Sequence, residues 1–259
     1  MWPLSPQAFL SLKQAFLRYY DQHVLIKKPH EIASIRKACQ ITSDIYEKVL
    51  SKDLKPGVRE KELVKKIYEY SVEMGADKTL AFPTMVGSGK NSSLVHSIPT
   101  QRRIKEGDVV QFDLGVRVSG YCSDLSRVVF MGKKKEAPKT IVKIMKLVKR
   151  LQKAGVQGLS EGKSLQEAAT IVWEGFRKED MHFHYLHSLG HGVGIEIHEF
   201  PRLSHEMDKE ILPRPGMIMT VEPGLYFPGK FGCRIEDTVL MTSSGAEVLT
   251  TATKRPWLH

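Results

Sequence analysis

Four carboxylates occupy matching positions in two stretches of the chain that are rich in β-forming residues. In each stretch, one acid lies six residues after a glycine, and a second acid lies four residues after a later glycine. The first stretch supplies Asp113 and Asp124, and the second supplies Glu222 and Glu236. Side chains alternate between the two faces of a strand, so each acid points away from the apolar residues beside it. We therefore expect two related hairpins to bring all four carboxylates together.

Four carboxylates gathered inside a protein require positive charge, because an unpaired buried carboxylate loses several kcal/mol of solvation. Divalent metal ions are the simplest source of that charge. The run HSLGHGVGIEIHEFP offers a ligand in His191, whose neighbouring glycines let the backbone approach a site closely, and His198 follows seven residues later. His96 is a further isolated candidate. A single histidine or acid is more often structural or solvated, but the repeated spacing of the acids favours a metal centre.

The elements that must position these side chains also repeat. Residues 28–132 and 138–247 each contain two helical patterns followed by a hairpin that carries two acids. Apolar residues at helical spacing predict helices that begin near Pro29 and Pro138, each followed by a second helical pattern. We expect an α+β fold in which two related halves form one sheet with helices packed on one side.

Residues 1–25 stand apart from this repeat as an N-terminal extension, while residues 26–259 form the domain that contains the repeat. Four apolar residues of the extension recur at helical spacing and predict an amphipathic helix. These residues are Phe9, Leu12, Phe16 and Tyr20. The apolar face of such a helix must cover another surface, either of this domain or of a second subunit.

The composition excludes several classes of protein. The 259 residues are 41% hydrophobic and 26% charged, which is typical of a soluble globular chain rather than a disordered one. No apolar run approaches the ~20 residues that span a bilayer, and the N-terminal sequence lacks the features of a signal peptide. Three widely spaced cysteines, Cys39, Cys122 and Cys233, argue against a disulfide framework. We expect a cytoplasmic protein without a membrane partner.

The formal net charge is +10, and many of the basic residues lie between Lys133 and Lys153. Apolar residues from Ile141 to Leu151 recur at helical spacing there, and basic residues fill the other face. A surface for nucleic acid or the ribosome is one interpretation of this pattern. A solvated outer helix is favoured, because no stacking aromatic residues or binding motif accompany the lysines, so we do not expect a nucleic-acid partner.

Five motifs, in this order, resemble those of the metallopeptidases with the pita-bread fold, which include methionine aminopeptidase, aminopeptidase P, prolidase and creatinase. The motifs are FDLG at 112–115, YCSD at 121–124, GHGVG with HEFP within 190–201, VEPG at 221–224 and GCRIED at 232–237. The resemblance covers about residues 26–250. It implies a metallopeptidase domain over residues 26–259, built of two pseudo-symmetric halves that form one curved antiparallel sheet with helices on its outer face.

The resemblance also implies a ligand set for two divalent metal ions. Asp113 would bind one ion, Asp124 and Glu236 would bridge the two, and His191 and Glu222 would bind the other. All five positions carry ligating residues, which argues against a metal-free binding protein of the same fold. Oxygen and imidazole donors suit Mn²⁺, Co²⁺, Zn²⁺ or Fe²⁺, and the similarity to aminopeptidase P favours Mn²⁺.

Within this family, the chain resembles the Xaa-Pro peptidases more than the methionine aminopeptidases, because Gly87 and Val95 stand where the latter are expected to have cysteines. His187 is at a position that lines the substrate pocket in aminopeptidase P. The segments similar to the Xaa-Pro peptidases are SG at 88–89, GYCSD at 120–124, GLY at 224–226 and RIED at 234–237. The implied substrate is a peptide with proline in second position. Methionine aminopeptidase activity is the alternative, and a non-enzymatic binding function is a further one.

The resemblance implies roles for the remaining site residues. Two divalent ions that share a water make hydroxide available near neutral pH. His96 and His198 would flank the scissile bond, with His198 donating to the developing oxyanion, and Glu222 would shuttle the proton. Arg234 and His187 would shape the substrate pocket, and an equal alternative is that Arg234 only neutralises the bridging acids. An open site favours removal of the first residue from peptides over strict dipeptide hydrolysis, and the sequence leaves the oligomeric state open.

Overall fold

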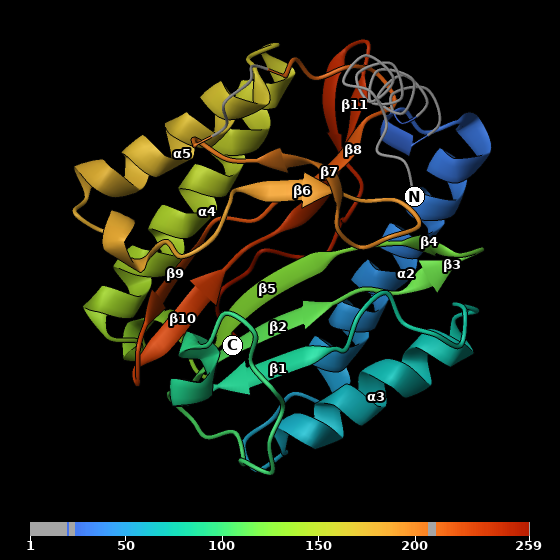
Figure 1. Ribbon diagram of the computed structural model, residues 1–259. Coiled ribbons are helices and arrows are strands. Elements are labelled where there is room, and N and C mark those ends of the chain that lie inside the picture. Colours follow the sequence, from blue (N-terminus) through green and yellow to red (C-terminus); the bar gives the residue numbers. More distant parts are fainter. Residues whose placement is uncertain (1–19, 21–23, 207–210, 259) are drawn as a thin grey trace, which may run out of the picture.

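Two halves of similar construction face each other, each with a helix pair and antiparallel strands (Figure 1). The computed structural model describes residue 20, residues 24–206 and residues 211–258. Its helices are α2 (Pro29–Lys52), α3 (Glu60–Glu73), α4 (Lys139–Ser160) and α5 (Leu165–Lys178), with the short 3-10 helices η2 (Gly89–Ser93), η3 (Lys134–Glu136) and η4 (His182–His184). Its strands are β1 (Met85–Ser88), β2 (Val109–Leu114), β3 (Arg117–Val118), β4 (Tyr121–Cys122), β5 (Leu125–Phe130), β6 (Gly190–Gly192), β7 (Glu199–Leu203), β8 (Ile218–Val221), β9 (Gly224–Phe227), β10 (Phe231–Arg234), β11 (Asp237–Thr242) and β12 (Gly245–Val248).

The helices of the first half begin with acids that cap them. α2 starts at Pro29, as the sequence predicts, and the Glu31 carboxylate accepts a hydrogen bond from the backbone N–H of Lys28 at 2.7 Å. α3 is capped in the same way, because the Glu62 carboxylate accepts from the backbone N–H of Arg59 at 2.8 Å. Acids in the first turn also interact favourably with the helix dipole. Both helices bury their apolar faces with residues of β1, β2 and β5.

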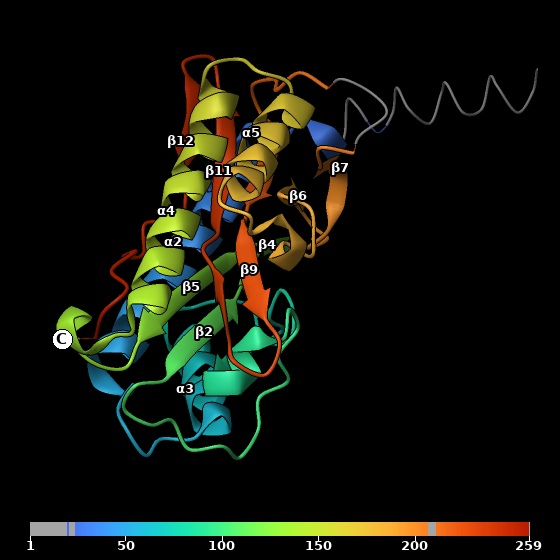
Figure 2. The same cartoon turned by 90° about the vertical axis from the view of Figure 1, so that its left-hand side faces the viewer.

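The helices of the second half show the predicted amphipathic pattern. In α4, Ile144 and Val148 are buried, whereas Lys146 is exposed. α5 begins with a capping box, in which Ser164 Oγ accepts from the backbone N–H of Glu167 at 3.2 Å. The two helices pack against each other and cover strands of this half. Seen edge-on, α2 and α4 lie along the same side of the strands (Figure 2).

The strands belong to four hydrogen-bonded sheets, in the orders β1-β2-β5, β12-β11-β8-β6-β7, β10-β9 and β3-β4. The named strand pairs are antiparallel, as expected. The two halves meet through single hydrogen bonds rather than a ladder, such as that from the Glu236 N–H to the Ser126 carbonyl at 3.1 Å. The prediction of one continuous curved sheet is therefore not confirmed, because the ladders stop where the chain turns its acids towards the centre.

The alternation of β2 separates the core from the site. Val110, Phe112 and Leu114 are buried with apolar residues of α2 and α3. Gln111 lies on the opposite face, where its Oε1 accepts from the backbone N–H of Arg234 in the second half at 2.7 Å. Alternation places Asp113 on the face of Gln111. As predicted, one face of β2 lies in the apolar core and the other carries Asp113, which points towards the second half.

The N-terminal extension contacts the second half through Tyr20 and Leu25. Leu25 is buried in the core of that half, and the Tyr20 hydroxyl accepts a hydrogen bond from the backbone N–H of Phe200 at 3.0 Å. The other members of the predicted amphipathic helix lie outside the described residues, and these are Phe9, Leu12 and Phe16. Among the helices within residues 24–206 and 211–258, none is long and apolar enough to cross a bilayer.

Candidate metal centre

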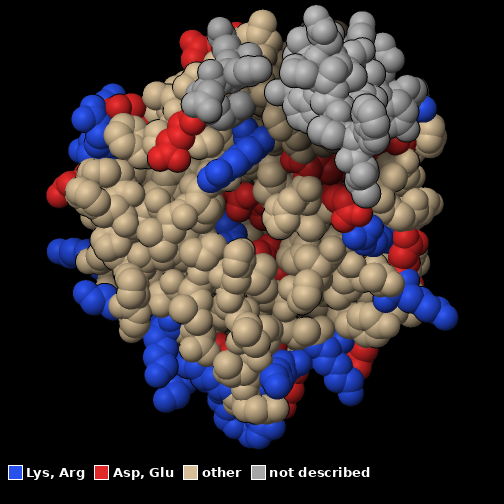
Figure 3. All heavy atoms as spheres, viewed as in Figure 1, with Lys and Arg blue, Asp and Glu red and all other residues tan. Residues whose placement is uncertain are grey.

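A cavity of about 950 Å³ opens where the two halves meet, and its lining includes every side chain that the sequence identifies as a site residue. Those side chains are His96, Asp113, Asp124, His187, His191, His198, Glu222, Arg234 and Glu236. On the face shown in Figure 3, acidic side chains lie inside a central hollow that is surrounded mainly by uncharged residues. The structure thus brings the candidate residues together, while their individual roles stay predictions.

The four acids lie in or directly beside strands at the junction of the halves. Asp113 is in β2 and Asp124 directly precedes β5, while Glu222 follows β8 and Glu236 precedes β11. The backbones of Asp124 and Glu236 are fixed by bonds across the junction. Thr238 Oγ1 donates to the Asp124 carbonyl at 2.8 Å, and the Glu236 N–H bond to the other half is described above. Two acids are therefore held in place by backbone contacts, independently of any ligand.

The sequence GHG allows β6 to pack closely between β7 and β8. A Cβ atom on Gly190 would collide with the carbonyl oxygen of Thr220, and one on Gly192 would collide with that of Phe200. Only glycine, which has no Cβ, fits on both sides of His191. The predicted close approach is therefore made to the neighbouring strands, and it fixes the place of His191 beside the acids.

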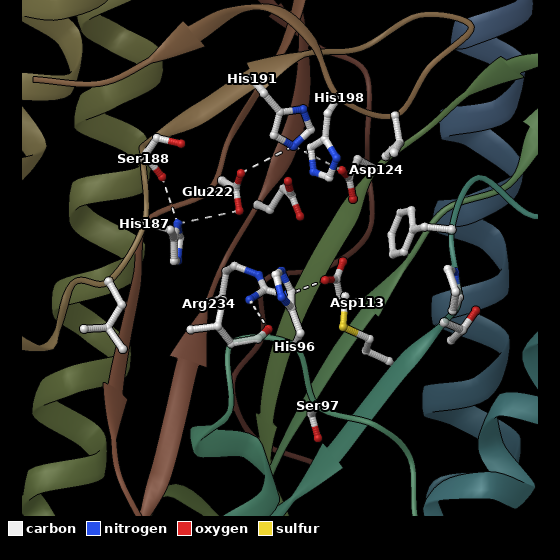
Figure 4. A pocket seen from close by; sticks show the side chains of 18 of the residues that line it. His96, Ser97, Asp113, Asp124, His187, Ser188, His191, His198, Glu222 and Arg234 are labelled. Carbon is white, nitrogen blue, oxygen red and sulfur yellow. Dashed lines mark hydrogen bonds and ion pairs between the residues drawn. The ribbon is translucent and has the colours of Figure 1, made fainter. Parts of the chain in front are cut away.

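His191 presents one ring nitrogen to the acids (Figure 4). Its Nε2 lies 3.6 Å from Asp124 Oδ2 and 3.5 Å from Glu222 Oε1, and single ligand atoms of Asp124, His191 and Glu236 all lie within 4.8 Å of one another. Its Nδ1 lies 3.0 Å from the Gly192 carbonyl, which assigns the ring proton to Nδ1 and leaves the Nε2 lone pair free. An imidazole oriented in this way is typical of a metal ligand.

Because these carboxyl groups are buried close together, they cannot all be ionised without cations. Burial, together with the nearby Asp113, raises the pKa of Glu236 to about 8. Burial and the Glu236 carboxylate also raise the pKa values of Asp124 and Glu222 well above their usual range. Burial lowers the pKa of His191 to about 4, so its imidazole is neutral at pH 7. Protons or metal cations must therefore balance the carboxylates.

Arg234 is the guanidinium that faces these acids. Its Nη2 donates to Asp113 Oδ2, its Nε donates to Ser126 Oγ at 2.7 Å, and its Nη1 donates to the Tyr226 hydroxyl at 2.7 Å. Nη1 also donates to the Val95 carbonyl at 3.1 Å. These contacts favour charge neutralisation over direct substrate binding, and the partner is Asp113 rather than a predicted bridging acid. Arg234 also lines the cavity, so a contribution to pocket shape stays a prediction.

The donor atoms fit divalent cations. Asp113 Oδ1 is buried and has no hydrogen-bond partner among the described residues. A buried carboxylate oxygen without a partner is costly unless a cation satisfies it. Carboxylate oxygens and one neutral imidazole are suitable ligands for several divalent transition metals.

His187 takes part in a hydrogen-bond chain at the cavity wall. Its Nδ1 lies 2.8 Å from the Ser188 carbonyl, so Nδ1 carries the proton and Nε2 accepts from the Tyr226 hydroxyl at 2.9 Å. Burial and the nearby Arg234 lower the pKa of His187 to about 3, which keeps the ring neutral. Both ring nitrogens are thus engaged within the protein, and the predicted role in shaping the pocket rests on the ring's position.

His96 and His198 are both exposed in the cavity. The planes of the His198 and His191 rings are inclined at 67° to each other, with 4.4 Å between the ring centroids. Figure 4 shows His198 beside His191 and Asp124, whereas His96 lies near Arg234 and Asp113. Both histidines face the cavity, and the arrangement in which they flank the scissile bond stays a prediction.

Two residues of the cavity region are not among the predicted site residues. Tyr226 connects Arg234 to His187, and the signal for it was the GLY segment at 224–226, which resembles the Xaa-Pro peptidases. Arg202 lines the cavity from β7, directly opposite His191 in the β6–β7 pairing. Among the described residues, no carboxylate forms an ion pair with Arg202. Its position within the sequence HEFPR, near the predicted His198, was the only signal for it.

Known proteins resemble this chain over most of its length. A model of the metallopeptidase family M24 matches residues 33–243. The Xaa-Pro dipeptidase of Pyrococcus furiosus is 38% identical over 226 residues, which are 87% of this chain and 63% of that protein. The Xaa-Pro dipeptidase of Pyrococcus horikoshii is 37% identical over 226 residues, covering 87% of this chain and 62% of that protein. The chain therefore spans a little under two thirds of the length of these curated relatives.

Solved structures share the fold. The prolidase from Pyrococcus furiosus has a TM-score of 0.86 at 34% identity, and the match covers 96% of this chain and 74% of that one. The X-Pro aminopeptidase from Thermotoga maritima has a TM-score of 0.85 at 29% identity, covering 98% of this chain and 72% of that one. The predicted family and the coarse α+β architecture are thereby confirmed. With these matches and its converging acids and imidazole, the chain belongs to the metallopeptidase family M24.

Proposed function

We propose that this chain is a metal-dependent exopeptidase that removes the N-terminal residue from peptides with proline in second position. The observation that carries the proposal is the convergence of four carboxylates and one imidazole in a single cavity, where the buried Asp113 Oδ1 has no hydrogen-bond partner among the residues that the structure describes. The names of the similar proteins, Xaa-Pro dipeptidase and X-Pro aminopeptidase, support the substrate class. The proposed partner is a peptide, and a cytoplasmic location without nucleic-acid binding stays a prediction.

The proposed centre holds two divalent cations. Asp113 would bind one, Asp124 and Glu236 would bridge the pair, and His191 and Glu222 would bind the other. When bound, such ions supply a nucleophilic hydroxide near neutral pH and polarise the scissile carbonyl. Mn²⁺ is the proposed metal, although oxygen and imidazole donors also accept Co²⁺, Zn²⁺ or Fe²⁺.

The side chains around the acids would position the peptide and move its protons. His198 is exposed beside His191 and would donate a hydrogen bond to the oxygen that becomes negative. His96, which lies near Arg234 and Asp113, would contact the substrate near the scissile bond. Glu222, whose Oε1 lies 3.5 Å from His191 Nε2, would take up and return the proton. Its Oε2 lies 3.9 Å from Nδ1 of the neutral His187.

The cavity wall suits an imino acid. An Xaa-Pro bond has no N–H, so proline must be recognised by its ring and its carbonyl rather than by a hydrogen-bond donor. Apolar residues that line the cavity would receive the ring, and they include Phe82, Met85, Ile98, Leu186 and Ile197. Shape and apolar contact would therefore determine the preference for proline.

Arg202 bears on whether the substrate is a dipeptide or a longer peptide. The sequence favoured an aminopeptidase over a strict dipeptidase, whereas the similar Pyrococcus proteins are dipeptidases by name. Arg202 is exposed, lines the cavity and has no carboxylate partner within the described part of the chain, so it suits the C-terminal carboxylate of a dipeptide. We therefore favour dipeptide hydrolysis. Replacement of Arg202 by Met should raise KM for Ala-Pro by about tenfold or more, since a hydrogen bond to a charged group contributes about 1.5–3 kcal/mol. Hydrolysis of Ala-Pro amide should change little.

Two alternative functions give different results in the same assay. A methionine aminopeptidase is not favoured, because the similar proteins are named for Xaa-Pro substrates. A non-enzymatic binding protein is disfavoured, because all five candidate ligands are present and lie in one cavity.

The experiment compares three peptides after metal is stripped and returned. Protein loaded with Mn²⁺, Co²⁺, Zn²⁺ or Fe²⁺ is incubated with Ala-Pro, Ala-Pro-Ala and Met-Ala-Ala, and the released amino acids are measured. The expected result is hydrolysis of Ala-Pro that is fastest with Mn²⁺, and its loss in a folded Asp113→Asn variant. Hydrolysis of Met-Ala-Ala alone, or of no peptide with any metal, would contradict the proposal.

A further inference from the structure

A buried guanidinium lies directly behind the candidate ligand Glu236. Arg127 in β5 is 1% exposed, and its Nη1 donates to the Glu236 carbonyl at 2.5 Å and to the Ser126 carbonyl at 3.0 Å. Its Nη2 donates to Asp237 Oδ1 at 2.7 Å. The side chain therefore reaches from the first half to two consecutive residues of the second half, one of which is a candidate metal ligand.

The rest of the Arg127 fork holds the C-terminal segment. Nη2 also donates to the Ala252 carbonyl at 2.9 Å, and Nε donates to the Thr253 carbonyl at 3.1 Å. An arginine has five N–H groups in a fixed planar arrangement, and here they meet acceptors from β5, from the Glu236–Asp237 step and from the C-terminal segment. A lysine, with a single nitrogen, cannot make this set of contacts.

Asp237 makes the fork rigid. It is fully buried, and its Oδ1 also accepts from Thr250 Oγ1 at 2.9 Å. Its Oδ2 accepts from Gln152 Nε2 at 2.8 Å and pairs with the Lys254 ammonium group. Both oxygens of this carboxylate thus have hydrogen-bond or ion-pair partners. These contacts hold the Arg127–Asp237 pair in one geometry.

The two predicted bridging acids differ in how they are supported. The backbone of Asp124 is fixed by the hydroxyl of Thr238, whereas the carbonyl of Glu236 is fixed by the guanidinium of Arg127. In the internal repeat, the position that matches Arg127 is Val239, three residues after the acid, so the second half offers no equivalent arginine. The Glu236 carbonyl therefore depends on a single charged side chain from the other half.

We propose that Arg127 is a positioning residue for the metal centre, which holds the Glu236 carboxylate ready to bind by fixing its backbone. The inference rests on the proposed function, because it assigns a metal to Glu236. Residues that orient a metal ligand without touching the metal typically change metal affinity by about 10–100-fold when they are replaced. We expect a loss of that size for Mn²⁺ when the fork is removed.

The test measures Mn²⁺ binding to metal-free protein by isothermal titration calorimetry, beside the melting temperature of the same metal-free samples. Arg127→Lys keeps the charge and loses the fork, and we expect Mn²⁺ affinity to fall about 10–100-fold. Lys254→Met is the matched control, because Lys254 contacts Asp237 but not Glu236. Its affinity should stay within about twofold of the wild type. A merely structural role would lower the melting temperature and leave the affinity of the folded protein unchanged.

Each outcome decides the inference. A folded Arg127→Lys variant with wild-type Mn²⁺ affinity would overturn it. If that variant does not fold, Asp237→Asn replaces it, because this change removes the ion pair that holds the fork and keeps its carbonyl acceptors. Several-fold weaker binding by Asp237→Asn supports the inference, and unchanged binding overturns it. Absence of Mn²⁺ binding by the wild type would instead overturn the proposed function, and this inference with it.

Discussion

Binding of divalent metal should release protons from this protein, because its candidate ligands hold protons in the metal-free state. Burial and the nearby Asp113 raise the pKa of Glu236 to about 8. At pH 7 this carboxyl is therefore about nine-tenths protonated, and at pH 9 it is about one-tenth protonated. The pKa values of Asp124 and Glu222 are raised as well, so they add to the release. We expect at least about 0.9 proton per protein to be released at pH 7, and fewer at pH 9.

Calorimetric titration with Mn²⁺ in several buffers measures this number directly. The slope of the observed enthalpy against the ionisation enthalpy of the buffer equals the number of protons released. The number should fall between pH 7 and pH 9, because Glu236 loses its proton in the metal-free protein as the pH rises through about 8. Metal binding without proton release at pH 7, or release that grows between pH 7 and pH 9, would refute the reasoning.

Three further predictions concern stability. The melting temperature of the metal-free protein should fall from pH 6 to pH 9, because the pKa of Glu236 is higher in the folded chain than its usual value. The stability that its protonation contributes is lost as the pH rises through about 8. A rising melting temperature would contradict this. Gly190→Ala should lower the free energy of unfolding by about 1–3 kcal/mol or more, measured by denaturant titration, because its Cβ would collide with the Thr220 carbonyl; an unchanged midpoint would refute the steric argument. Tyr226→Phe should cost about 1–3 kcal/mol in the same assay, because two buried hydrogen bonds are lost, whereas Tyr46→Phe should be nearly neutral, because that buried hydroxyl has no partner among the described residues. Equal losses in both variants would contradict it.

The elements that carry local signals could be predicted from the sequence. α2 begins at Pro29 and α4 follows Pro138, because prolines and apolar stripes are properties of neighbouring residues. The placement of Asp113 away from the core follows from alternation within a single strand. The repeated spacing of the acids predicted that all four would lie together, because the two halves repeat the same construction.

Contacts set by tertiary packing could not be predicted in this way. Arg202 lies opposite His191 only because of the β6–β7 register, which shifts next to His191. The strands form separate sheets because the hydrogen-bond ladders end at the junction of the two halves. The pattern of neighbouring residues does not indicate where a ladder ends. Apart from the neighbouring Ser126 carbonyl, the acceptors of Arg127 lie more than 100 residues away in the sequence, in segments that the chain brings together only when both halves and the C-terminal segment are in place.

The position of bound metal tests the central claim most directly. A crystal of the protein soaked with Mn²⁺ should give two anomalous-scattering peaks inside the cavity. One peak is expected beside Asp113, the other beside His191 and Glu222, with Asp124 and Glu236 between them. A cavity without peaks at saturating Mn²⁺, or peaks bound by other residues, would contradict the account.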